Sequence, residues 1–283
     1  MDKFSVDSLE PQFLAKVLKS ERITPDNIEE IREVTLQVDD PKFTCDLNEC
    51  FGVVVEEPGK DHVQHHRLYN VADIPSDGVH NQFTFQVKRC NYIDSFSGEE
   101  VQGITSNYLC SRKKGDEITI TGPYPLPFKI PEDHHSNLIL IGLGTGISPF
   151  RAFMKHLHSK VKNWQGTIRL FYGSKNGLEL IYTNDEERDL AQYYDQKTYN
   201  AFQDLSPRPY WMDSFTNDSN IEERAEEILD TLWQSDTYIY VAGHKRIMEN
   251  LETAFSAILG SKVKWAIRKA DLIRSGKWVE LLY

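Results

Sequence analysis

The sequence predicts two domains: an antiparallel β-barrel or sandwich, followed by a doubly wound α/β domain. In the first half, short runs of alternating or β-branched residues are broken by turn signals such as Pro58-Gly59 and Ser97-Gly98. In the second half, apolar strand-like runs alternate with helical patterns, which is typical of a parallel sheet covered by helices. Four prolines, at 123, 125, 127 and 131, mark a linker. We therefore predict domains at 1–133 and 134–283.

The first domain is predicted to consist mainly of strands. Turn residues separate the runs, and Thr105 or Ser106 followed by Gly115 delimits one small helix. The expected elements are a short helix at 12–19, strands at 28–38, 46–55, 67–73, 82–89 and 116–122, and the small helix at 107–113.

The second domain is predicted to alternate strands with helices. Its expected strands are 138–141, 167–173, 237–241 and 278–282, and its expected helices are 149–160, 184–194, 221–234 and 245–259, with a polar stretch at 195–220.

A glycine-rich turn follows the first of these strands. Gly142, Gly144 and Gly146 interrupt an apolar run, Ser148 can cap the next helix, and Pro149 suits that helix's first turn. Such a turn presents bare N–H groups and the positive end of a helix dipole, so a dinucleotide pyrophosphate would fit. The spacing departs from the usual G-x-G-x-x-G pattern, which would need glycine at Ile147.

Composition narrows the functional classes. The chain has 283 residues and a net charge of -11, which argues against nucleic acid as a partner. Basic residues nevertheless outnumber acidic ones eight to four from His244 onward, so that segment could receive an acidic partner or a phosphate, although a solvated helix face is the simpler explanation for any single charge. The N-terminus resembles neither a signal nor a transit peptide and no apolar run spans 18 residues, so we expect a cytoplasmic protein.

The cysteines and histidines do not predict a metal site. Cys45, Cys50, Cys90 and Cys110 lack the spacing of a zinc or iron–sulfur site and are expected to be reduced core thiols. The histidines lie in polar stretches without partner ligands, so no metal is expected.

Four motifs in order resemble the plant-type ferredoxin:NADP reductase family. They are Arg67-Leu-Tyr69-Asn70; Val87-Lys88-Arg89 with Tyr92 and then Gly103-Ile104-Thr105-Ser106; Gly142 to Arg151; and Tyr240-Val-Ala-Gly243 with the C-terminal Trp278-Val-Glu-Leu-Leu-Tyr283. The resemblance covers most of the chain. It implies an FAD-binding antiparallel β-barrel followed by an NADP(H)-binding α/β domain.

The resemblance also implies roles for residues of the first domain. Arg67 would hold the FAD pyrophosphate, since guanidinium groups pair well with phosphate, and Tyr69 would stack on the flavin; a strand residue in a surface salt bridge is the simpler alternative for Arg67. Asn70 replaces the family's serine and can still donate a hydrogen bond near flavin N5. The remaining cofactor contacts expected in this domain are Val87, Lys88 toward the NADP phosphates, Tyr92 toward adenine, Gly103, Ile104, Thr105 and Ser106.

In the second domain the resemblance assigns a nucleotide site and a terminal gate. Gly144, Thr145, Gly146, Pro149 and Gly243 would contact the nucleotide, and Ser206 with Arg208 would read the 2′-phosphate, although no Lys-x-Tyr follows them.

Tyr283 would cover the flavin face, and Glu280 is the nearest carboxylate to the chain end. Together with Asn70 these form the expected catalytic set. Leu281 and Ala242 stand where the family has a glutamate and a cysteine.

The expected function is therefore an FAD-dependent oxidoreductase that transfers electrons between NADPH and a one-electron carrier, ferredoxin or flavodoxin. Docking of this carrier is expected near Lys113, Lys114 and the basic C-terminal segment. Two alternatives remain: an NAD(P)H-dependent reductase component of an oxygenase or other pathway, with NADH possible, and a flavin- and nucleotide-binding interaction subunit with little turnover.

Overall fold

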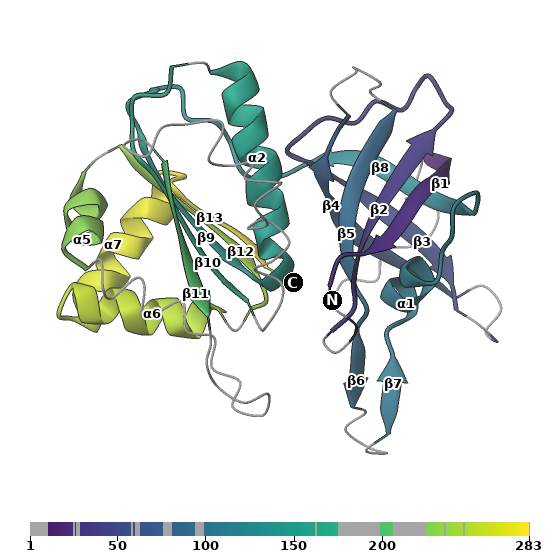
Figure 1. Ribbon diagram of the computed structural model, residues 1–283. Coiled ribbons are helices and arrows are strands. Elements are labelled where there is room, and N and C mark those ends of the chain that lie inside the picture. The colour runs from purple at the N-terminus through teal and green to yellow at the C-terminus, as the bar shows by residue number, and fades with distance from the viewer. Residues whose placement is uncertain are drawn as a thin grey trace. The chain divides into compact units, whose positions relative to one another are not determined.

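The computed structural model forms two compact units, Met1–Leu126 and Pro127–Tyr283 (Figure 1). The sequence predicts this boundary seven residues later, after residue 133. The structure describes residues 11–24, 26, 29–57, 59, 63–75, 81–93, 99–161, 163–174, 199–205, 225–234, 236–245 and 247–282.

The first unit is a closed antiparallel barrel. Its strands are β1 (Gln12–Arg22), β2 (Ile31–Val38), β3 (Glu49–Glu56), β4 (Gln64–Asp73), β5 (Gln82–Lys88) and β8 (Glu117–Pro125), in the order β1-β2-β5-β4-β3-β8. A small two-stranded sheet, β6 (Asn91–Ile93) with β7 (Glu100–Gln102), and the helix α1 (Ile104–Cys110) complete it. Pro123 and Pro125, predicted as linker, belong to β8.

The predicted helix at 12–19 is wrong, because these residues form the first part of β1. Phe13, Ala15 and Val17 are buried, and the residues between them are exposed. This alternation has the period of a strand and would bury only part of a helix face. The free energy gained by burying alternate residues in the barrel outweighs the helix propensity of the Ala, Leu and Lys in this segment, so the segment forms a strand.

Aromatic rings dominate the barrel core. Phe51 is fully buried and meets Phe83 and Phe85 edge-on, at centroid distances of 4.7 and 5.0 Å. Edge-on contacts of this kind are a preferred geometry for aromatic pairs. The cysteines of the chain are free; Cys45, Cys50 and Cys110 are buried as expected, whereas Cys90 is exposed.

The second unit is built on a parallel five-stranded sheet in the order β11-β10-β9-β12-β13. Its strands are β9 (Asn137–Leu143), β10 (Ile168–Ser174), β11 (Tyr199–Leu205), β12 (Thr237–Gly243) and β13 (Trp278–Leu282). Its described helices are α2 (Ile147–Lys160), α5 (Ala225–Trp233), α6 (Ile247–Ile258) and α7 (Lys262–Arg274).

Two elements of this unit are not predicted from the sequence: β11, which lies in the predicted polar stretch, and α7. The predicted helix at 184–194 lies outside the described residues.

Alternation along the central strands gives the sheet two apolar faces. Ile139, Ile141, Ile239 and Val241 join the core formed with α5, α6 and α7. Tyr240 points the other way and contacts Phe153 of α2 at 5.6 Å. Figure 1 accordingly shows α2 on one face of the sheet and α5, α6 and α7 on the other. Within the described ranges, no helix is both long and apolar enough to cross a membrane.

Candidate functional site

The carboxyl ends of β9 and β12 mark the switch point of the parallel sheet. From β9 the chain continues outward through β10 and β11 on one side, whereas β12 and β13 lie on the other. In open α/β sheets, ligands bind outside the carboxyl ends of the strands at such a point, because the connections there diverge and leave a crevice. The glycine turn lies at this point.

The turn is packed so tightly that Gly146 cannot carry a side chain. A Cβ atom on Gly146 would lie 2.2 Å from the carbonyl oxygen of Ala242 and 2.9 Å from the Cα of Gly243. Gly243 has φ +139°, which disfavours any residue with a Cβ atom. The short helix Gly144–Gly146, with Thr145 in its middle, therefore lies directly on the end of β12. The structure thus brings Gly144, Thr145, Gly146 and Gly243 together at the end of β12.

Ser148 is not the helix cap. The N-cap of α2 is Gly146, no side chain caps the helix, and Ser148 is a buried residue of the first turn. Pro149 follows it in the first turn, where its missing N–H costs nothing. The first N–H groups of a helix have no acceptor within the helix, so an uncapped end of this kind suits an anion such as a pyrophosphate.

The two residues expected to bind the 2′-phosphate, Ser206 and Arg208, lie outside the described residues. Leu205, which precedes them, is the last residue of β11 and ends at the same carboxyl edge as β9, because the strands are parallel.

In the barrel, β4 presents Arg67 and Tyr69 two residues apart. Arg67 is exposed, and its Nη1 donates to the carbonyl oxygen of His66 at 3.0 Å. The half-buried ring of Tyr69 lies 5.5 Å from that of Phe85, and burial raises the pKa of its phenol well above the usual value. The ring therefore stays uncharged at every physiological pH. Asn70 is half-buried and lies opposite Cys50 of β3.

The helix α1 begins earlier than predicted. It spans Ile104–Cys110 with Gly103 as its N-cap, so neither Thr105 nor Ser106 is the cap. The N–H of Gly103 donates to the Cys90 carbonyl oxygen at 2.8 Å, and a Cβ atom on Gly103 would lie 2.8 Å from the same oxygen. Ser106 Oγ accepts the Cys90 N–H at 3.2 Å. Because residue 103 is glycine, α1 can begin in direct contact with Cys90, two residues after β5. The Ser106 hydroxyl, which was expected to cap the helix, instead hydrogen-bonds to Cys90.

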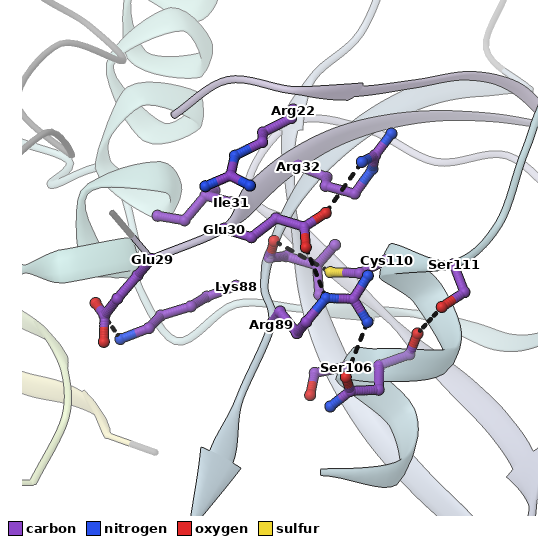
Figure 2. Close-up of polar contacts among 12 residues, drawn as sticks. Arg22, Glu29, Glu30, Ile31, Arg32, Lys88, Arg89, Ser106, Cys110 and Ser111 are labelled. Atoms are coloured by element: carbon purple, nitrogen blue, oxygen red, sulfur yellow. Dashed lines mark hydrogen bonds and ion pairs between the residues drawn. The ribbon is translucent and has the colours of Figure 1, made fainter. Parts of the chain in front are cut away.

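An ion-pair network that the sequence analysis missed fixes this start (Figure 2). Arg89 donates from Nε to Glu30 Oε2 at 2.6 Å and from Nη1 to Asn107 Oδ1 at 2.8 Å. The Asn107 amide in turn donates to the carbonyl oxygens of Cys90 at 3.0 Å and Gly103 at 2.9 Å. Arg89 belongs to the second of the four motifs, but nothing in the sequence shows that its partner Glu30 is 59 residues away.

The other predicted residues of this region differ in their surroundings. Lys88 Nζ forms an ion pair with Glu29 Oε2 at 2.6 Å, visible in Figure 2, so its charge is already partnered. Val87 is buried and can offer a ligand only its backbone. Tyr92 lies in β6, and its side chain is outside the described set.

The Glu280 carboxylate makes polar contacts within the second unit. Its Oε1 accepts from Trp278 Nε1 at 2.5 Å and lies 3.7 Å from Lys269 Nζ of α7. Its catalytic role therefore stays a prediction, as does that of Tyr283, which lies outside the described residues. Leu281 pairs with Ala242 in the sheet.

Stability should depend on pH through Glu30. The Arg89 hydrogen bond, together with Arg32 and against an opposing effect of burial, lowers the pKa of the Glu30 carboxyl. A lowered folded-state pKa stabilises the fold above the unfolded-state value of about 4.3, and this contribution is lost as the pH falls through the folded-state pKa.

We expect Glu30→Gln to lower the free energy of unfolding by about 1 kcal/mol at pH 7. The difference from wild type should shrink below about pH 4, where the Glu30 carboxylate becomes protonated. Urea midpoints measured across this range test it. Glu56→Gln, at an exposed strand end, is the control; an equal loss in both variants, or a pH-independent difference, would contradict the prediction.

The chain combines a closed antiparallel barrel with a parallel α/β unit, and the glycine turn lies at the switch point of the parallel sheet. Residues 140–253 match the family described as the oxidoreductase NAD-binding domain. The chain is 29% identical over 236 residues to the ferredoxin–NADP reductase of Synechocystis sp. and 29% identical over 231 residues to the chloroplastic leaf isozyme 1 of this reductase from Arabidopsis thaliana. Each alignment covers 79% of this chain, which spans 55% and 63% of the two relatives, respectively. The chain is therefore similar to ferredoxin–NADP reductases over 79% of its length.

Solved structures share the fold. The ferredoxin-NADP+ reductase of Plasmodium falciparum superposes with a TM-score of 0.71 at 22% identity, covering 99% of this chain and 98% of that one. A structure of the same enzyme with 2′P-AMP gives a TM-score of 0.68 at 19% identity, covering 98% of each chain.

Proposed function

We propose that the chain is an FAD-dependent reductase that passes electrons between NADPH and a one-electron carrier protein, ferredoxin or flavodoxin. The observation that carries the proposal is the turn Gly144–Gly146, which lies on the end of β12 with no room for a Cβ atom at Gly146. A backbone surface of this kind at a switch point fits the pyrophosphate of a dinucleotide. The names of the relatives support NADP and ferredoxin as the two substrates.

In this proposal the barrel holds FAD. When bound, FAD supplies the chemistry that links a two-electron hydride donor to a one-electron carrier. Arg67 would pair with the pyrophosphate, and the uncharged Tyr69 ring would lie against the flavin. The segment 103–106 would add backbone donors and the Ser106 hydroxyl. Asn70 would donate an amide hydrogen bond to the flavin.

The second unit would bind NADP(H). Thr145 and the N–H groups at the start of α2 would contact the pyrophosphate, with Pro149 fixing the first turn of the helix. Ser206 and Arg208 would read the 2′-phosphate, and Tyr283 would cover the flavin until nicotinamide replaces it.

Lys113 and Lys114 would receive the acidic carrier protein. Both are exposed in the turn after α1, where they form a basic pair in a chain of net charge -11. Opposite charges steer such encounters and mainly raise the association rate. Charge reversal at both residues should raise the KM for ferredoxin more than that for ferricyanide.

The test of the proposal is anaerobic mixing of the purified, flavin-loaded protein with NADPH or NADH while flavin absorbance is followed. Fast bleaching by NADPH alone supports it. Comparable bleaching by both nucleotides would favour the reductase component of another pathway. Bound flavin that neither nucleotide reduces would overturn the proposal in favour of an interaction subunit.

Flavin retention should depend on Arg67. We expect Arg67→Gln to raise the Kd for FAD about tenfold or more, because a charge-assisted contact to phosphate contributes about 1.5–3 kcal/mol. Fluorescence titration of the apoprotein with FAD measures the change. Lys16→Gln removes an equal charge from an exposed position in β1 and should leave the Kd unchanged; the same Kd for both variants would remove Arg67 from the site.

A further inference from the structure

The helix α7 has apolar residues on two opposite faces. Its inner face buries Trp265 and Leu272, and Trp265 stacks on Phe255 of α6 at 4.5 Å. Three branched apolar residues on the opposite side are exposed: Val263 by 68%, Ile267 by 61% and Ile273 by 54%. A helix packed on a domain normally shows polar residues to solvent, so packing within this unit does not account for the second apolar face.

The exposed residues form one continuous stripe. At about 100° per residue, Val263, Ala266, Ile267, Ala270 and Ile273 fall on one side of the helix, opposite Trp265 and Leu272; we call these five residues the outer stripe. Ala266 and Ala270 are exposed as well. Valine and isoleucine are poor helix formers and gain nothing from facing water, so they indicate a surface that makes contact.

Positive charge borders the outer stripe. Lys262 and Lys264 flank Val263 in the first turn, where the helix dipole favours acidic residues, and that turn contains none. Neither lysine forms an ion pair with another described residue, whereas Lys269 pairs with Glu252. The whole helix carries five basic residues and one acidic residue in a chain of net charge -11. This local excess matches an anionic partner.

An exposed tryptophan lies beside the helix. Trp233, the last residue of α5, is 57% exposed, and its ring lies 5.8 Å from the guanidinium carbon of Arg268. Arg268 Nε also donates to the carbonyl oxygen of Leu232 at 2.7 Å, which ties α7 to the end of α5. By the same spacing of about 100° per residue, Arg268 falls on the side of Trp265 and Leu272, so this contact holds the packed side of α7 and leaves the outer stripe facing away from α5.

We propose that the outer stripe of α7 is a contact surface for an anionic membrane. The surface of a single helix is convex, and a deformable lipid surface can cover such a shape without a preformed groove. An apolar stripe bordered by lysines is the pattern of helices that lie in the membrane interface. The negative charge elsewhere on the chain is screened beyond a Debye length of about 10 Å at 0.1 M salt, so the charge of α7 acts locally.

The experiment is cosedimentation of the full-length protein with vesicles of phosphatidylcholine containing about one-third phosphatidylserine, at about 0.1 M salt. We expect binding to these vesicles and none to pure phosphatidylcholine. The double variant Lys262→Gln/Lys264→Gln should lower the partition coefficient about 30-fold, and Ile267→Ser about tenfold.

Matched control variants test whether vesicle binding depends on the outer stripe itself or only on the protein's overall charge and exposed apolar surface. Lys113→Gln/Lys114→Gln removes the same charge from the barrel, and Leu14→Ser removes an apolar side chain that is 63% exposed on β1; both should bind as wild type does. Lys262→Arg/Lys264→Arg should retain binding. Equal partition into both vesicles, no partition, or equal losses in test and control variants would overturn the proposal. Ile267-dependent dimerisation without vesicle binding would instead assign the face to a second copy.

Discussion

Replacing Gly146 with alanine is expected to lower kcat/KM for NADPH about 100-fold. The new Cβ atom would lie 2.2 Å from the Ala242 carbonyl oxygen, so either the turn or the end of β12 must move. Overpacking of this kind costs about 1–3 kcal/mol, and here it displaces the N–H groups proposed to hold the pyrophosphate. Stopped-flow flavin reduction with NADPH measures the effect, and FAD content should not change.

Gly166→Ala is the matched control. There a Cβ atom would lie 1.8 Å from the Ser136 carbonyl oxygen, a comparable clash in the same unit. Gly166 and Ser136 precede β10 and β9, so this clash lies at the amino ends of the strands, away from the switch point. It should cost stability and leave the KM for NADPH unchanged. If Gly146→Ala stays within about twofold of wild type, the turn does not bind the nucleotide.

Phe51→Ala should destabilise the barrel by about 3–5 kcal/mol, the cost of deleting a fully buried phenylalanine. Its ring meets Phe83 and Phe85 and lies 6.2 Å from Tyr69, so the cavity would open beneath the proposed flavin contact. We therefore expect weaker FAD binding in addition to lower stability. Hydrogen exchange of peptides from β5 measures the barrel's opening free energy.

The positions of the tryptophans provide an internal control. All five, at 164, 211, 233, 265 and 278, belong to the second unit, so tryptophan fluorescence follows that unit alone. In Phe51→Ala this signal should keep its urea midpoint while β5 loses protection. Phe51→Leu, which fills most of the volume, should lose less. If Phe51→Ala lowers the opening free energy of the barrel by less than about 1 kcal/mol, the core must repack around the cavity, contrary to this prediction.

Strong periodic signals predicted most of the fold. The run at 138–141 is apolar throughout because β9 is buried on both faces, and the predicted strand lies within the observed one. β11 was missed because its sequence, Tyr199–Leu205, mixes polar and apolar residues without alternation. α7 was missed because the outer stripe adds apolar residues to its exposed face and blurs the helical period.

The part of the candidate site that the sequence predicts correctly is a backbone feature, the glycine turn. The glycine turn was found because three closely spaced glycines directly after an apolar run indicate a tight turn at the end of a buried strand. The cap assignments of Thr105 and Ser148 were wrong because the glycines before the helices take that position, and propensity favours serine and threonine there. The Arg89–Glu30–Asn107 network depends on strand pairing between β2 and β5, which local sequence does not encode.

The barrel is closed by its first and last strands, since Gln12–Lys16 of β1 pair with residues 117–121 of β8. A ribosome makes these partners more than a hundred residues apart, so the nascent chain exposes an unfinished sheet edge until β8 emerges. Unpaired edges of this kind invite aggregation. Pauses in translation before β8 has emerged from the ribosome should therefore be more hazardous to this protein than later pauses.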